Sequence, residues 1–372
     1  LTGQPSYTGQ GRQPGKQCHQ GVLIRRFRNP GITRRSTLGR LLNTATVALP
    51  IFFRLLLSRR RGVLLVDSTS PFLPVVTLLI YWLRRWPFVY LIEDLYPDIA
   101  IQLGYMRPKG IVARFWVRIH RWLYGSASRF IVLGPRMRER VLAQVGATDR
   151  LDRARDVAVI HNWANGDLIK PIAKSENWFC EAHGLSEAMV ILYSGNMGSS
   201  HDLESIVRAA DRLRSLTDVK FVFIGGGAKR ETIVALVAEL GLDNVQVLPY
   251  QRREDLPYSL TCGDVSVVAL EPGIEGLSVP SKLYSSLAAG QAVLAIMNEG
   301  SEVGDIIREE HCGFRVDPGD VDGVAGVIRR FHDDPQLLAS ARENSRACFD
   351  ARFSRPQAIE SYSRVLSEAS TR

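Results

Sequence analysis

The segment from Glu271 to Tyr284, EPGIEGLSVPSKLY, carries residue types that can bind a phosphate group. It leads into small and apolar residues that favour a helix, and either Ser278 or Ser281 could cap that helix. Free amides at a helix N-terminus carry about half a positive charge, and Lys282 adds a full charge beside them. The segment therefore predicts a diphosphate site, with helix capping alone as the alternative.

Glycines follow predicted strands in two other loops, SGNMGSS at 194–200 and GGG at 225–227. Backbone amides in the first loop could hold phosphate at the start of the following helix. The second loop lacks Cβ atoms, so either a ligand or a neighbouring helix could approach its backbone closely. The positions concerned are Gly195, Asn196, Gly225 and Gly226.

Acidic residues follow another predicted strand. Glu93 and Asp94 come directly after the apolar run Phe88–Ile92. In open parallel sheets ligands bind beyond the carboxyl ends of the strands, so we predict that both carboxylates face a cleft. There a carboxylate could orient or deprotonate an acceptor hydroxyl. The alternative is that it caps the turn at 95–97.

These positions depend on a fold with parallel strands. Apolar runs of β type alternate with helical stretches in both halves of the chain, which predicts doubly wound α/β domains. The predicted domains are 1–170 and 171–350, followed by a C-terminal helix at 351–372 that packs across them. Ser354 and Gln357 would begin that helix as a capping box. The predicted strands are Val22–Arg26, Val63–Val66, Phe88–Ile92, Phe130–Leu133, Val157–Ile160, Met189–Tyr193, Lys220–Ile224, Val245–Leu248, Val265–Leu270 and Val293–Ile296.

Several of these segments together resemble a known family. They are YSGNMGSSHDLESI, GLSVPSKLYSSLAAGQAVLAI and LIEDLYPDIAIQLG. In order and spacing they resemble family 4 glycosyltransferases of the GT-B fold, within the branch that makes bacterial surface polysaccharides. The resemblance covers nearly the whole chain. It implies an α/β fold in which Rossmann-like domains face a cleft, with the acceptor on the N-terminal domain and the nucleotide sugar on the C-terminal domain.

The activity that the resemblance implies is a retaining transfer of a hexosyl or N-acetylhexosaminyl group from a nucleotide diphosphate sugar, with UDP as the expected nucleotide. The acceptor would be lipid-linked or a polysaccharide, and no metal or other cofactor is expected. A departing nucleoside diphosphate carries about two negative charges, which Lys282 and the helix end would stabilise. The predicted donor-site residues are Gly195, Asn196, Gly225, Gly226, Tyr250, Gln251, Ser278, Ser281 and Lys282, and the predicted catalytic residues are Glu93, Asp94 and Lys282.

This sequence departs from the family pattern in several places. Many members carry an E-x7-E pair leading into this helix, whereas the matching positions here are Leu277 and Ser285. In place of the usual Arg and Lys after the first strand of the C-terminal domain, the loop offers Asn196 and His201. Glu275 is then the predicted substitute in the donor site. The family's opening strand, glycine loop and helix have no counterpart here, so we expect a truncated N-terminal domain and impaired activity.

Charge is divided unevenly along the chain. Residues 1–170 hold 27 Lys and Arg against 9 Asp and Glu, whereas residues 171–372 hold 20 against 29. A basic half indicates an anionic partner such as nucleic acid, anionic lipid or a diphosphate-linked acceptor. Arginines beside apolar segments suit peripheral contact with the inner membrane leaflet, where a polyprenyl-diphosphate acceptor would be presented; the alternative is solvated arginines over core helices. These arginines are Arg59, Arg60, Arg61, Arg84, Arg85, Arg114, Arg118 and Arg121.

Other classes of protein receive less support. The sequence has no zinc-finger spacing or aromatic RNA-binding segment, so we expect no nucleic-acid partner. A sugar-nucleotide epimerase with the same domain plan stays an alternative to a transferase. The apolar stretches Leu41–Leu57 and Phe72–Leu83 are too short and too broken to cross a bilayer, and with five scattered cysteines they indicate a cytoplasmic protein. The acidic pair Asp320 and Asp322 is expected to cap a helix rather than to bind a metal.

Overall fold

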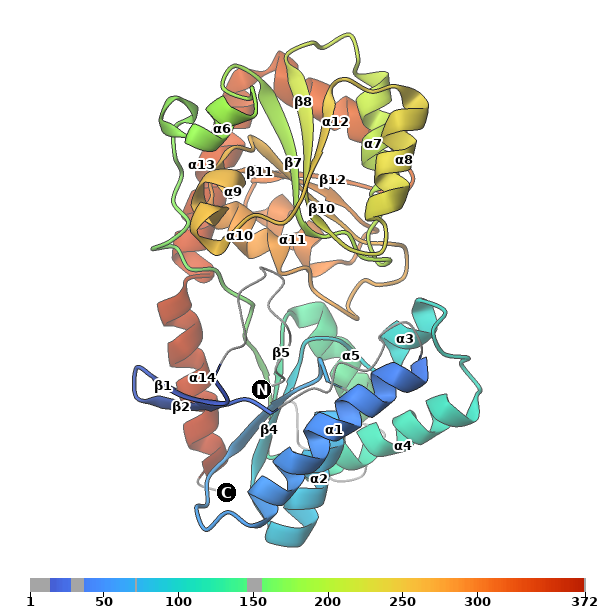
Figure 1. Cartoon of the computed structure of the whole chain (residues 1–372), viewed down its shortest axis with the longest axis vertical. Coiled ribbons are helices and arrows are strands. Elements are labelled where there is room, and N and C mark those ends of the chain that lie inside the picture. The colour runs from blue at the N-terminus through green and yellow to red at the C-terminus, as the bar shows by residue number, and fades with distance from the viewer. Residues whose placement is uncertain (1–13, 28–36, 71, 146–155, 371–372) are drawn as a thin grey trace.

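The computed structural model describes residues 14–27, 37–70, 72–145 and 156–370 (Figure 1). Its parallel sheets belong to two domains that lie one above the other, with helices packed around each sheet (Figure 1). The C-terminal sheet has six strands in the order β12-β11-β10-β7-β8-β9, and the N-terminal sheet has four in the order β3-β4-β5-β6. The predicted pair of Rossmann-like domains is therefore confirmed.

The central strands of the C-terminal sheet are continuous apolar runs. β10 (Val265–Ala269) and β11 (Ala292–Ile296) are buried along their whole length, as expected of parallel strands covered on both faces. The other strands are β7 (Met189–Asn196), β8 (Val219–Gly226), β9 (Val245–Leu248) and β12 (Gly313–Val316). The helices are α6 (Trp178–Ala182), α7 (Glu204–Arg212), α8 (Arg230–Leu240), α9 (Leu256–Thr261), α10 (Lys282–Ala288), α11 (Glu302–Glu309), α12 (Val321–Asp333) and α13 (Pro335–Arg352).

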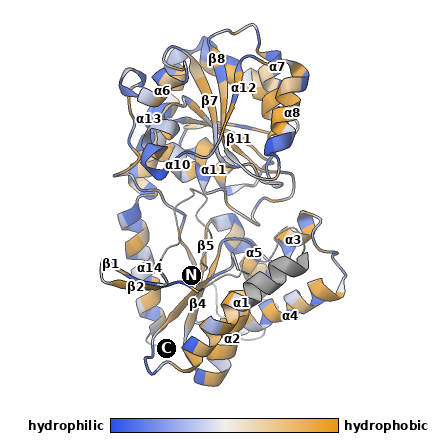
Figure 2. Cartoon of the chain, in the orientation of Figure 1, coloured by the Kyte–Doolittle hydropathy of each residue, from blue (hydrophilic) through white to orange (hydrophobic). Residues whose placement is uncertain are grey.

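The N-terminal sheet is centred on β4 (Phe88–Ile92), which is fully buried. The mostly hydrophobic helix α2 (Phe72–Arg84) packs against this sheet and against its neighbouring helices (Figure 2). None of the described helices is long and apolar enough to span a bilayer. The other elements are β3 (Leu64–Asp67), β5 (Arg129–Val132), β6 (Val157–Val159), α1 (Thr37–Leu56), α3 (Asp98–Gln102), α4 (Ile111–Ser126) and α5 (Pro135–Val145).

The strand predicted at Val22–Arg26 exists, but it lies outside both sheets. β2 (Val22–Arg25) pairs with β1 (Lys16–His19) in an antiparallel hairpin. Neither β1 nor β12 was predicted. Both strands are four residues long and mostly not buried, so their sequences lack the continuous apolar run that identifies the core strands.

The last helix, α14 (Arg355–Ser370), leaves the C-terminal domain and packs beside β4 of the N-terminal domain (Figure 1). The predicted capping pair meets at its start, since the Gln357 Oε1 atom accepts hydrogen bonds from the Ser354 amide at 3.0 Å and from its hydroxyl at 2.7 Å. Arg129 of β5 forms an ion pair of 3.3 Å with Glu368 near the end of the helix. The chain thus crosses between the domains twice.

A buried carboxylate joins the domains at a second place. Glu302 begins α11, is 3% exposed, and its Oε1 atom accepts a hydrogen bond of 2.7 Å from the backbone amide of Met137. That amide lies in the first turn of α5, where helix amides lack partners within the helix. A Cβ at Gly134 would lie 2.2 Å from Glu302 Cγ, so only glycine fits there. Glu302 therefore caps a helix of the opposite domain.

Glu302→Ala is expected to lower the free energy of unfolding by about 1–3 kcal/mol, because the Met137 amide would be left buried without an acceptor. Glu302→Gln keeps an acceptor oxygen and should lose less. Urea unfolding followed by tryptophan fluorescence measures both, with the exposed Glu299→Ala as control. Equal stability of the Glu302→Ala and Glu299→Ala variants would contradict this account.

Candidate functional site

The segment after β4 touches the segment before α10, and this contact brings the predicted residues of both domains together. The Leu95 amide donates a hydrogen bond of 2.8 Å to the Leu277 carbonyl oxygen, and Asp94 and Ser278 pair as an antiparallel bridge. The Asp94 carboxylate also hydrogen-bonds the Ser278 side chain. The alternative that Asp94 serves the turn after it therefore lacks support, because its partner lies in the other domain.

A cavity of about 290 Å³ lies at this contact, between the two domains. Its volume is at the lower end of the range for small-molecule pockets. The polar side chains that line it come from both domains: Asp94, Tyr96, Tyr105, Asn196, Ser200, His201 and Ser278. Loops at the carboxyl ends of β4, β7 and β10 form its walls, which is the edge at which doubly wound sheets bind ligands.

Burial raises the pKa of the Asp94 carboxyl, although its bond to Ser278 acts in the opposite direction. Burial, Asp67 and Asp94 together raise the pKa of Glu93. The backbone amides of both residues donate to the Ser68 hydroxyl, each at 3.0 Å. Asp94 lines the cavity, whereas Glu93 lies close enough to α14 to act on the Tyr362 hydroxyl.

Lys282 is a half-buried cation beside this cavity. Its Nζ atom lies 5.0 Å from the centre of the Tyr193 ring and donates a hydrogen bond of 3.4 Å to the Asn196 carbonyl oxygen. Among the described residues it has no carboxylate within ion-pair distance. Burial lowers the pKa of Lys282 to about 8. An anion beside the ammonium would offset this cost of burial.

The glycines of the two loops make room for one another and for Lys282. A Cβ at Gly195 would lie 2.8 Å from Lys282 Cε, and one at Gly225 would lie 2.0 Å from the Gly195 carbonyl oxygen. A Cβ at Gly226 would lie 3.1 Å from Tyr250, whose hydroxyl donates to the Gly226 carbonyl oxygen at 3.1 Å. Close packing of neighbouring loops thus explains these glycines, whether or not a ligand binds there.

Two of the remaining predicted donor-site residues, Glu275 and Gln251, hydrogen-bond to backbone groups. The Glu275 carboxylate accepts hydrogen bonds from the amides of Gly273 at 2.9 Å and Asn298 at 3.3 Å. Gln251 donates to the Pro249 carbonyl oxygen at 2.9 Å. Ser281 occupies the N-cap position of α10, but its side chain makes no capping hydrogen bond. The prediction that the Ser281 side chain caps this helix is therefore wrong.

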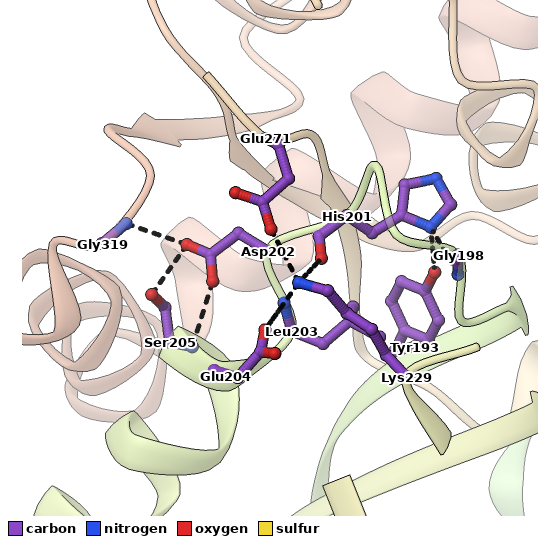
Figure 3. Close-up of polar contacts among 10 residues, drawn as sticks. All are labelled: Tyr193, Gly198, His201, Asp202, Leu203, Glu204, Ser205, Lys229, Glu271 and Gly319. Atoms are coloured by element: carbon purple, nitrogen blue, oxygen red, sulfur yellow. Dashed lines mark hydrogen bonds and ion pairs between the residues drawn. The ribbon is translucent and has the colours of Figure 1, made fainter. Parts of the chain in front are cut away.

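Sequence reasoning missed Lys229, which stands at the N-cap of α8. Its Nζ atom donates to the carboxylates of Glu204 at 2.9 Å and Glu271 at 2.6 Å, and to the His201 carbonyl oxygen at 2.8 Å (Figure 3). Two carboxylates surround one ammonium, so this cluster carries no surplus positive charge. The position of Lys229 next to the GGG loop could have drawn attention to it, but nothing in the sequence indicated which carboxylates it contacts.

His201 was noted in the sequence only as a residue in place of the family's Arg and Lys, and it was left out of the predicted site residues. The Gly198 amide donates to its Nδ1 atom at 3.3 Å, and the Tyr193 hydroxyl lies 3.0 Å from the same atom (Figure 3). Burial, followed by the charge of Lys282, lowers the pKa of His201 to about 3, so the ring is neutral near pH 7. A neutral imidazole keeps one N–H, so His201 is an uncharged donor that lines the cavity.

Neighbouring acidic residues have structural roles. Asp202 accepts hydrogen bonds from the Ser205 hydroxyl at 2.7 Å and the Gly319 amide at 2.8 Å (Figure 3). Asp320 caps α12 by accepting from the Gly323 amide at 2.8 Å, as predicted. Within the described residues no group of three or more His, Cys, Asp and Glu is placed to hold a metal ion. Cys18 is exposed and the other cysteines are buried, all of them as free thiols.

Rossmann-like domains that face each other across a cavity at the carboxyl ends of their sheets define the GT-B class of glycosyltransferase folds. Family models match both parts of the chain: "Glycosyl transferase 4-like domain" over residues 4–163 and "Glycosyl transferases group 1" over residues 180–347. The chain therefore belongs to this family of glycosyltransferases. The resemblance inferred from its sequence is confirmed.

Individual relatives agree with this assignment. "Probable glycosyltransferase WbjE" of Pseudomonas aeruginosa is 29% identical over 72% of this chain, and the lipopolysaccharide core biosynthesis glycosyltransferase LpsD of Rhizobium meliloti is 24% identical over 65% of it. The matches span 66% and 64% of these relatives, just under two thirds of their length. The crystal structure of HepE from Anabaena with UDP and glucose has the same fold, with a TM-score of 0.69 and 17% identity over 93% of this chain and 86% of HepE.

Gly225→Ala is expected to destabilise the protein by about 2 kcal/mol or more, because the new Cβ would overlap backbone that cannot move aside. Gly300→Ala is the matched control, since Gly300 also has a positive φ, 75°, but has no atom within 4 Å of its Cβ position. Urea unfolding of both variants compares Gly225, at φ 141°, whose Cβ would overlap backbone, with a glycine of positive φ whose Cβ would meet no atom. Equal losses would show that the contact between the loops is unimportant.

Proposed function

We propose that this chain transfers a hexosyl or N-acetylhexosaminyl group, with retention, from a UDP-sugar to a lipid-linked or polysaccharide acceptor. The observation that carries the proposal is Lys282, a half-buried cation without a carboxylate partner among the described residues, beside a cavity lined by both domains. The name of LpsD, with its reference to lipopolysaccharide, and the UDP and glucose in the HepE structure support the choice of acceptor and donor.

The charge distribution suits departure of a nucleoside diphosphate. The leaving group gains negative charge in the transition state, and fixed donors that meet this charge are the largest source of catalysis in many enzymes. Lys229 contributes no surplus charge because Glu204 and Glu271 neutralise it. Lys282 is then the cation for the diphosphate, with the His201 ring and the amide of Asn196 as neutral donors. The Gly225 and Gly226 loop and Tyr250 lie beyond them, where the nucleoside would extend.

Asp94 would act on the acceptor. It faces the cavity from the N-terminal domain, opposite the loops that would hold the donor phosphates. A carboxyl whose pKa is raised by burial is a better proton acceptor than an exposed one when it is ionised. Retention requires the acceptor oxygen to reach the face of the sugar that the diphosphate leaves, and a carboxylate on this side of the cavity can orient that hydroxyl. Glu93, the neighbouring carboxyl on the side away from the cavity, would help to keep Asp94 in place.

UDP-sugars are expected to stabilise the wild-type protein in a thermal-shift panel that also contains GDP- and ADP-sugars, because binding to the folded state raises its stability. Lys282→Ala should lose most of this stabilisation, Lys282→Arg should keep part of it, and the exposed Lys170→Ala should behave as wild type. The donor hypothesis fails if no nucleotide sugar shifts the melting temperature.

The affinity for UDP is expected to fall as the pH rises through about 8, because the Lys282 ammonium then loses its proton in the free protein. In Lys282→Met this step should disappear, since no ammonium titrates there. Calorimetric titrations with UDP between about pH 7 and about pH 9 measure the effect, a range that stays below the ordinary pKa of an exposed lysine. A step of the same size in Lys282→Met would assign the titration to another group.

Asp94→Asn is expected to reduce kcat by about a hundredfold or more, while the affinity for UDP changes little, because the amide fills the same space but cannot accept the hydroxyl proton. The measurement is sugar transfer to a lipid-linked or polysaccharide acceptor, and the exposed Asp167→Asn is the control. Conversion of the UDP-sugar into an isomeric UDP-sugar without any acceptor would instead favour the epimerase alternative.

A further inference from the structure

Helices α1, α2 and α4 form one continuous outer face of the N-terminal domain, with α2 in the middle (Figure 1). Large apolar side chains point outward from it: Leu57, directly after α1, Trp82 and Leu83 of α2, and Ile111, Phe115 and Trp122 of α4. Leu57 is 77% exposed and Ile111 is 79% exposed. Clusters of this kind are uncommon on soluble proteins and mark interaction surfaces. We name these six residues the apolar face.

The side chains of the apolar face are brought together by the fold. Ile111, Phe115 and Trp122 follow the spacing of one helical stripe along α4. The ring of Trp82 on α2 contacts the ring of Trp122, with centroids 5.6 Å apart. Arg84 of α2 donates a hydrogen bond of 3.0 Å to the Ser58 carbonyl oxygen, which holds the end of α1 next to the end of α2. The face is therefore continuous across the helices.

The charges around this face are all of one sign. α1, α2 and α4 contain no acidic residue. Arg118 lies over the Trp122 ring at 5.2 Å. Within the part of the chain that the structure describes, no carboxylate pairs with the exposed arginines of this region, which are Arg54, Arg59, Arg60, Arg61, Arg85, Arg114, Arg118 and Arg121.

We infer that the apolar face and its arginines dock onto an anionic lipid bilayer. Arginines reach the negative headgroups while the apolar side chains enter the boundary with the acyl chains, as in interfacial helices. A second copy of this chain would bring like charges together. A nucleic acid would pair with the arginines but would leave Leu57, Leu83 and Ile111 in water. An anionic bilayer offers headgroups to the arginines and an apolar interior to the apolar side chains.

The position of this face connects it to the candidate site. α4 begins at Ile111, shortly after Tyr105, which lines the cavity between the domains. A membrane under α4 would therefore present a lipid-anchored acceptor close to Asp94. This link between docking and acceptor rests on the proposed function, whereas docking itself is independent of it.

The test is co-sedimentation of the purified chain with phosphatidylcholine vesicles and with vesicles that also contain phosphatidylglycerol. We expect binding to the anionic vesicles that weakens with added salt and is much lower on the neutral ones. The triple variant Arg114→Gln, Arg118→Gln and Arg121→Gln should bind at least about tenfold less. Arg208→Gln, Arg212→Gln and Arg329→Gln, which remove the same charge from the C-terminal domain, should bind as wild type.

The apolar contribution is tested in the same assay. Phe115→Glu with Trp122→Glu should abolish binding, whereas Val234→Glu with Ile359→Glu, which alters exposed apolar residues elsewhere, should not. Stabilisation by UDP-sugar in each variant shows that it is folded and that the donor site is intact. Vesicle binding without any response to nucleotide sugars would overturn the proposed function and leave this inference standing.

The inference is overturned if the wild-type chain stays in the supernatant with anionic vesicles, or if both sets of control variants lose as much binding as the test variants. It is also overturned if sedimentation velocity shows a dimer that Phe115→Glu with Trp122→Glu dissociates, or if DNA or RNA removes the protein from vesicles and binds it at physiological salt. Dissociation of a dimer would assign the face to a second copy of the chain, and displacement by DNA or RNA would assign it to a nucleic acid.

Discussion

The architecture depends on one constraint: two parallel sheets must present their carboxyl ends to each other across a narrow gap. The hydrogen bond from the Leu95 amide to the Leu277 carbonyl oxygen meets that constraint at the centre, since it joins the loop after β4 to the loop before α10. Glu302 meets it at a second point by capping α5, and α14 returns the chain to the N-terminal domain. These connections bring Asp94 and Tyr105 of one domain to the same cavity as Asn196 and His201 of the other.

The two lysines of the site, Lys229 and Lys282, differ in whether carboxylates neutralise their charge. Lys229 is held by two carboxylates and ties three loops together, so its role is structural. Lys282 is half-buried against Tyr193 and has no such partners among the described residues, and this burial lowers its pKa. The proposed anion site rests on this difference, because a lysine with a purely structural role is usually paired. This contrast, more than the glycines, identifies the position at which a diphosphate would bind.

The basic and acidic halves of the chain form different surfaces of the protein. Eight exposed arginines of the first half lie on or next to α1, α2 and α4, on the side of the N-terminal domain that also exposes aromatic and aliphatic side chains. The acidic C-terminal half contains the loops that surround Lys282. An anionic nucleotide and an anionic surface would therefore meet different domains, and the cavity between the domains is the place where a group carried by one could reach the other.

The sequence alone determined the core strands and the loops after them, because a strand covered on both faces must be a continuous apolar run, as in Phe88–Ile92 and Val265–Ala269. It also located Asp94 and Lys282, since ligands bind where such strands end. Only the tertiary structure decided what these residues contact: the pairing of Lys229 with Glu204 and Glu271, the neutral ring of His201, and the glycines packed between loops. β1 and β12 were not predicted for a related reason, because short strands without a buried apolar run are defined by their neighbours. Burial leaves a local pattern in a sequence, but the identity of the residues that meet across the fold does not.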